Sequence, residues 1–322
     1  GELAAGAMSR LSCLILLAPA VAAASCGTDE VPWPAAGGSI ACEPLAAARR
    51  TALAWLRANA PPWDLMNEYS LFGAPGGVDG LEFGVASVGV NASLAAKMRR
   101  PWAAAVPRDV FDDYSLPYAC VNEPRTDWRA LVGAAVDPVV DALPAGASLD
   151  DVVAAINGYG ANASDSVWAR LGGVVFKSSQ TPLIYDPVST AAFGYASCTG
   201  VSVTFVAALR AAGVPARLVG TPAWRGDPAN GNHNWVEIYR EGNWSFIEAH
   251  PAGGGETLDD PCDKWFCNAA HFPSGKNATT VFAARFDRVH NDSVYPMAWD
   301  PTNLDVPGVD RTADYFAMCS KC

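Results

Sequence analysis

The chain has 322 residues, of which 50% are apolar and only 17% are charged, against roughly 25% charged residues in an average soluble protein. This composition excludes intrinsic disorder as the main state and supplies enough apolar side chains for one large domain or two ordinary ones. Acidic residues outnumber basic ones by 33 to 22, and the net charge of −11 would repel a phosphate backbone. We therefore expect a folded, acidic protein that does not bind nucleic acid.

Residues 1–24 have the order of a secretory signal peptide. Arg10 precedes the apolar run 11–18, and small residues at an A-x-A spacing place the cleavage site after Ala24. The apolar run is too short to span a membrane, and a buried core helix is the alternative interpretation. We predict a protein that is secreted or lies in the lumen of the secretory pathway, without membrane contact after cleavage. Residues 1–7, which precede the first methionine, are expected to be a reading-frame remnant.

Two further patterns fit export. Five N-x-S/T triplets are possible glycosylation sites, at Asn91, Asn162, Asn243, Asn277 and Asn291. Six cysteines occur as pairs, namely Cys26 with Cys42, Cys262 with Cys267, and Cys319 with Cys322. In an oxidising compartment such pairs predict disulfides. A zinc site built from the last four is the alternative, although no histidine stands at ligand spacing beside them.

The first half of the chain is dominated by helical patterns. Apolar residues recur at helical spacing over residues 45–57, 81–98 and 126–143. Ser148, followed by a leucine and two aspartates, is an N-cap with acidic residues at the positive end of a further helix. We predict a helical N-terminal region over residues 25–145.

Strand patterns replace helical ones from about residue 214. The β-rich segments are 216–223, 234–239, 244–249 and 280–286. A turn over residues 240–243 joins the second of them to the third. Helices first and strands later indicate an α+β fold, because a parallel βαβ fold would alternate them. We predict a core domain over residues 146–272 and a small C-terminal β extension over residues 273–322 that carries the last cysteine pair.

Cys198 stands just before a predicted helix with an apolar face, which Gly213 and Pro215 bring to an end. At a helix N-terminus, unpaired N–H groups and the helix dipole favour an anion. Such positions lower the pKa of a thiol and favour the reactive thiolate. The same N–H groups could stabilise an oxyanion. The sequence therefore predicts a nucleophilic thiol at this position.

His233 and Glu248 follow on the two strands of a predicted hairpin. If a two-residue loop closes the hairpin, Tyr239 pairs with Trp244, and His233 falls on the same face as Glu248 at a diagonal position. The β-carbons of such neighbours lie roughly 7–8 Å apart, a gap that a glutamate side chain can cross. A lone cysteine or histidine is more often structural than catalytic. The three residues together supply the nucleophile, base and orienting carboxylate of thiol catalysis.

The segment around these residues resembles the core of the transglutaminase-like, papain-related superfamily, which also includes peptide N-glycanases. The matching motifs are ASCTG at Cys198, RAAGVPAR at the helix end, LVGTPxW, NHNWVE at His233, and the W-x-x-x-acid spacing that ends at Glu248. The motifs LPYACVNEPRTDWR, YPMAWDP and VPGVDRTADY resemble a secreted subgroup of this superfamily. The resemblance implies a nucleophile helix packed on an antiparallel sheet, with helices added before this core.

The resemblance also implies roles for single residues. Cys198 would be the nucleophile, His233 the general base and Glu248 the orienting carboxylate, a position at which the family usually has aspartate. The aromatic oxyanion donor of the family has no clear counterpart, and the candidates are Trp168, Phe176 and Gln180. His250 is a rival base if the hairpin register differs. We expect no cofactor and no metal, because the acidic cluster Asp259, Asp260 and Asp263 lacks the spacing of a calcium loop.

These features predict a thiol enzyme that acts on a peptide or isopeptide-like amide in a peptide or protein substrate. Cys198 would form a thioester, which water resolves in hydrolysis and an amine acceptor resolves in crosslinking. We favour hydrolysis, because water needs no binding site for a second substrate. The alternative from another class is a non-catalytic binding module of the same fold.

Overall fold

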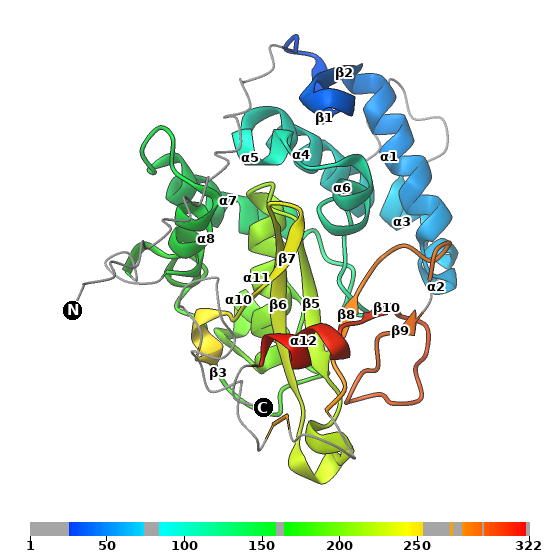
Figure 1. Cartoon of the computed structure of the whole chain (residues 1–322), viewed down its shortest axis with the longest axis vertical. Coiled ribbons are helices and arrows are strands. Elements are labelled where there is room, and N and C mark those ends of the chain that lie inside the picture. The colour runs from blue at the N-terminus through cyan, green and yellow to red at the C-terminus, as the bar shows by residue number, and fades with distance from the viewer. Residues whose placement is uncertain are drawn as a thin grey trace, which may run out of the picture.

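The computed structural model describes residues 26–73, 84–158, 164–253, 271–272, 279–291 and 293–319, and Figure 1 shows their arrangement. The predicted signal peptide, the sequons at Asn162 and Asn277, the acidic cluster and three of the last four cysteines lie outside these ranges. Among the described residues, no helix is both long enough and apolar enough to cross a membrane.

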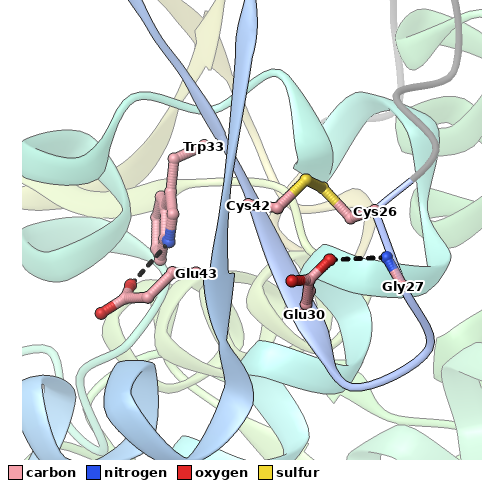
Figure 2. Close-up of a disulfide and its surroundings, with 6 residues drawn as sticks. All are labelled: Cys26, Gly27, Glu30, Trp33, Cys42 and Glu43. Atoms are coloured by element: carbon pink, nitrogen blue, oxygen red, sulfur yellow. Dashed lines mark hydrogen bonds between the residues drawn. A yellow bond between two sulfur atoms is a disulfide. The ribbon is translucent and has the colours of Figure 1, made fainter.

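The described chain begins with a short antiparallel hairpin of β1 (Glu30–Pro34) and β2 (Ile40–Pro44). A disulfide joins Cys26, which precedes the hairpin, to Cys42 on β2, as predicted (Figure 2). On the hairpin itself, the Trp33 indole N–H donates to a Glu43 carboxylate oxygen over 2.8 Å. The disulfide and this cross-strand bond hold a two-stranded unit that would be marginal by itself.

Helices follow the hairpin and confirm the three predicted helical segments. They are α1 (Leu45–Asn59), α2 (Pro62–Met66), α3 (Glu68–Phe72), α4 (Val85–Arg99), α5 (Pro101–Ala104), α6 (Arg108–Tyr114) and α7 (Trp128–Asp141). The first of these helices enclose an apolar cluster of their own, which includes Leu56, Phe72 and Leu94. This helical layer packs against the β6–β7 hairpin described below, where the rings of Tyr114 and Trp244 meet edge to face at 4.6 Å.

The next helices are α8 (Leu149–Asn157), α9 (Val167–Arg170), α10 (Pro187–Phe193) and α11 (Cys198–Ala211). The predicted cap of α8 is present as a capping box between Ser148 and Asp151. Helix α11 stops before Gly213, which has a φ of +79°. A β-carbon there would lie 2.7 Å from the β-carbon of Ala103, so glycine permits both the backbone turn and the close approach of α5.

Six antiparallel strands form the main sheet, in the order β7-β6-β5-β8-β10-β9. Their bounds are β5 Ala216–Thr221, β6 His233–Arg240, β7 Asn243–Ile247, β8 Phe282–Ala284, β9 Ser293–Val294 and β10 Pro307–Asp310. Strand β5 ends before Pro222, short of the predicted residue 223, because proline cannot donate to the ladder. The C-terminal residues thus extend the sheet of the core. The predicted domain boundaries remain predictions.

Helix α11 covers one face of this sheet, and α12 (Thr312–Met318) covers the other (Figure 1). The alternation of strand side chains explains this two-sided burial: Val236 packs with the α11 core, whereas its neighbour Trp235 packs against α12. The indole N–H of Trp235 donates to the Tyr315 hydroxyl over 2.7 Å. The fold is α+β with a helix packed on an antiparallel sheet, as predicted.

A buried charge network locks β5, β6 and the start of α12 together. Glu237 on β6 is paired in register with Arg217 on β5. The Arg217 guanidinium contacts a Glu237 oxygen at 2.6 Å, and Arg311 contacts the other oxygen at 3.1 Å. Only 1% of the Glu237 side chain is exposed. The two arginines satisfy a carboxylate that burial alone would strongly disfavour.

Candidate functional site

Cys198 is the first residue of α11, so the helix begins one residue earlier than the sequence predicted. Its half-buried thiol is not in a disulfide. The thiol lies in a cleft of about 440 Å³ whose other lining residues include His233, Thr199 and Trp299. Lying at the first position of the helix, the backbone N–H of Cys198 has no intrahelical acceptor. The positive end of the helix therefore faces the cleft at this thiol.

The predicted hairpin brings His233 to Glu248. Strand β6 begins at His233, and the register pairs Tyr239 with Trp244 and Val236 with Ile247, so that Glu248 follows directly after β7. The Nε2 atom of His233 lies 2.5 Å from Oε1 of Glu248. The structure therefore brings together the histidine and carboxylate that the sequence predicted to meet.

The His233 ring is also fixed by aromatic neighbours. It packs beside two indoles, with ring centroids 5.9 Å from Trp235 and 6.5 Å from Trp224, and the two indoles also contact each other at 6.4 Å. The interplanar angles are 25° and 23°. These contacts restrict the ring, whose nitrogens bond to the carboxylate of Glu248 and to the thiol of Cys198.

The electrostatics of the site favour a thiolate–imidazolium pair. Burial opposes ionisation of Cys198, but its pKa is lowered by the hydrogen bond and charge of His233 and by the backbone N–H groups of Asn234 and Thr199. Burial likewise opposes the charge on His233, yet hydrogen bonds to Cys198 and Glu248 raise its pKa to about 9. Each partner thus stabilises the charged form of the other, as in other activated thiols.

Asn234 is a member of the site that the sequence analysis did not identify. Its Nδ2 donates to the Thr199 hydroxyl over 3.0 Å, and its Oδ1 accepts from the Tyr295 hydroxyl. Its carbonyl oxygen accepts from Ser202 over 3.1 Å. These bonds fasten the start of β6 to the first turns of α11 and so fix the thiol relative to the imidazole. A β-carbon on Gly220 would come within 2.5 Å of Asn234 Oδ1, which explains the glycine.

Asn157 at the end of α8 fixes the backbone on both sides of the carboxylate. Its Nδ2 donates to the carbonyl of Glu248 over 2.9 Å, and its Oδ1 accepts from the backbone N–H of His250 over 2.8 Å. The rival base His250 is exposed, and the carboxylate contacts His233 instead. One signal in the sequence could have indicated Asn157, namely a polar residue at the end of a helix pattern whose last turns are otherwise apolar.

None of the three predicted oxyanion donors directs a side-chain N–H into the cleft. The indole N–H of Trp168 donates to Asn157 Oδ1 over 3.4 Å, and Gln180 Nε2 donates to the carbonyl of Ser178 over 3.3 Å. Phe176 lines the cleft but has no side-chain donor. The candidates were chosen by residue type, whereas the direction of each side chain depends on its local partners.

One group of possible metal ligands occurs among the described residues, namely Cys26, Glu30 and Cys42. Both sulfur atoms belong to the disulfide (Figure 2), and a carboxylate oxygen of Glu30 accepts from the Gly27 N–H over 2.8 Å. These donors are therefore already used. Cys319 is also disulfide-bonded, in agreement with the predicted oxidation of the last cysteine group and against a zinc site there.

Comparison with known proteins supports the resemblance to the transglutaminase-like superfamily. Residues 153–249 match the model of the transglutaminase-like superfamily, and this range contains Cys198, His233 and Glu248. The matched region is thus similar to the core of that superfamily, whose members are typically cysteine-based enzymes. Comparison with curated proteins found no match.

Among solved structures, the chain is similar to a crystal structure from Cytophaga hutchinsonii that is named as a proposed cysteine protease. The TM-score is 0.31 at 16% sequence identity, and the similarity covers 60% of each chain. The matched region thus spans about three fifths of that protein's length.

Proposed function

We propose that the protein is a secreted thiol enzyme that cleaves or transfers a peptide or isopeptide-like amide through a thioester on Cys198. The observation that carries the proposal is the continuous chain of contacts from the thiol to His233 and on to Glu248. It combines a nucleophile, a base and an orienting carboxylate in one cleft, which is the arrangement that covalent acyl transfer requires.

In the proposed reaction, the Cys198 thiolate attacks the amide carbon, and the carbonyl electrons move to oxygen. The imidazolium of His233 protonates the departing nitrogen, the C–N bond breaks, and a thioester and a free amine result. Water, deprotonated by His233, then attacks the thioester and releases a carboxylic acid and the thiol. Glu248 stabilises the charged ring at each stage.

Water and an amine are competing second reactants. Hydrolysis is our preferred reaction, because water needs no site of its own, and crosslinking to an amine acceptor is the alternative within the same chemistry. The disulfides at Cys26–Cys42 and Cys319 support an oxidising compartment. They agree with the proposed secretory route.

The test is alkylation of the native protein with iodoacetamide across a pH series, followed by peptide mapping. We expect labelling of Cys198 with a midpoint well below the ordinary thiol value of roughly 8.5. Cys198→Ala should abolish this labelling and all turnover of a peptide library, measured with and without a primary amine, while circular dichroism stays unchanged. Unchanged turnover in the alanine variant would refute the role of Cys198 as the nucleophile, and an ordinary midpoint with no turnover by the wild-type protein would favour a non-catalytic binding module.

A further inference from the structure

Ser197 precedes the thiol at the N-cap position of α11, but it does not cap the helix. A serine at this position usually accepts a hydrogen bond from a backbone N–H in the first turn. Here its side chain makes no cap bond. The Ser197 Oγ lies instead 2.6 Å from Thr181 Oγ1, on the loop between β3 (Val175–Phe176) and α10. The Ser197 hydroxyl therefore bonds to the Thr181 hydroxyl and not to the first turn of the helix.

The two hydroxyls carry one proton more than their mutual bond uses. Each has one proton to donate, and the bond between them consumes one of the two. Neither hydroxyl has another hydrogen-bond partner within the part of the chain that the structure describes. Whichever residue donates, the proton of the other remains available. Ser197, Thr181 and Cys198 all line the same cleft.

We propose that Ser197 donates this spare proton to the oxyanion that forms when Cys198 attacks a carbonyl, and that Thr181 is the positioning residue that holds the hydroxyl. The inference rests on the proposed function and names a donor for it. The backbone N–H of Cys198 supplies a second donor, because its helical position leaves it without an intrahelical acceptor. Ser197 is 5% exposed, so its hydroxyl is held largely away from water, where a preorganised donor is most effective.

The Thr181 hydroxyl explains how so short a side chain is kept in place. If Thr181 donates to Ser197 Oγ, the serine oxygen is occupied as an acceptor and its own proton points elsewhere. A hydroxyl fixed in this way needs little reorganisation when negative charge develops on the carbonyl oxygen. The donors predicted from sequence are engaged with Asn157 and with the Ser178 carbonyl, so the hydroxyl pair takes their place.

Two small reagents separate this role from the reactivity of the thiolate. With p-nitrophenyl acetate, the thiolate attacks the acetyl carbon, and the carbonyl electrons form an oxyanion. The oxyanion then collapses to a thioester and expels p-nitrophenolate. With iodoacetamide, the thiolate displaces iodide from a saturated carbon, and no oxyanion forms. Loss of an oxyanion donor should therefore slow the first reaction and leave the second unchanged.

For Ser197→Ala we expect acylation by p-nitrophenyl acetate to fall about 10²-fold, the lower range for removal of one oxyanion donor, with alkylation by iodoacetamide at the wild-type rate. Thr181→Val should slow acylation to a smaller extent and likewise leave alkylation unchanged. Ser197→Thr should restore acylation. Ser178→Ala is the matched control, because Ser178 lines the same cleft without joining the pair. It should behave as wild type in both reactions.

The proposal is overturned if Ser197→Ala changes neither rate, or if it lowers both rates in parallel, since a parallel loss means that the residue only positions the thiolate. Thr181→Val provides the same comparison should the alanine variant fold poorly. Failure of the proposed function has a different signature: the wild-type protein itself would then resist both reagents.

Discussion

Replacing Glu248 with glutamine tests the electrostatic coupling on which the proposed mechanism depends. The pKa of His233 is raised from 6.5 to about 9, which corresponds to roughly 3 kcal/mol of extra stabilisation of the imidazolium at 1.36 kcal/mol per unit. This gain remains after burial has opposed the charge, and it is shared between Cys198 and Glu248. If the carboxylate supplies half of it, its loss should lower the pKa of His233 to about 8.

A lower pKa of His233 should change the pH dependence of turnover. Proton donation to the leaving nitrogen requires the charged ring, so turnover should decline above the pKa of His233. In the Glu248→Gln variant this alkaline limb should move to lower pH. Turnover at neutral pH should also fall by about 10²–10⁴-fold, because a neutral amide can select the wrong imidazole tautomer. Glu248→Asp, which shortens the side chain, should give a partial loss.

The pKa of His233 can be read from the ring protons by NMR titration, because the chain has only 4 histidines. Glu241→Gln is the matched control, since Glu241 lies exposed at the turn of the same hairpin. It removes the same charge without touching the imidazole. An unchanged pKa and unchanged turnover in Glu248→Gln would refute the orienting role of the carboxylate. The enzyme would then depend on the Cys198–His233 pair alone.

Three further predictions concern stability and thiol chemistry. Replacing Cys26 and Cys42 together with serine should lower the free energy of unfolding in urea by about 3 kcal/mol, because it opens a loop with a sequence separation of 16; an unchanged value would mean that the hairpin contributes little. Glu237→Gln should cost about 3–5 kcal/mol by the same measurement, because it leaves the buried guanidinium of Arg217 without its carboxylate, and a loss below 1 kcal/mol would contradict this. Cys120 should remain unalkylated in the native protein and react only after unfolding, because burial raises its pKa to about 12; labelling at the rate of Cys198 would contradict its burial.

Local patterns in the sequence were sufficient to predict much of the site. The end of α11 followed from glycine and proline chemistry, and the cap of α8 followed from a serine three residues before an aspartate. The hairpin register followed from a two-residue loop and the alternation of strand side chains, and it alone placed His233 beside Glu248. These signals act over a few residues, so no knowledge of distant partners was needed.

The tertiary structure decided the contacts between distant segments. Tyr295 reaches Asn234 across 61 positions of sequence, and Asn157 reaches the Glu248 carbonyl across 91. The sequence analysis assigned no role to the short hydroxyl of Ser197, because its partner Thr181 lies on a different loop. A short polar side chain carries little information about its direction until packing fixes both partners. For that reason the sequence predicted the nucleophile, base and carboxylate, whereas only the folded chain identified the residues that hold them and the hydroxyl beside the thiol.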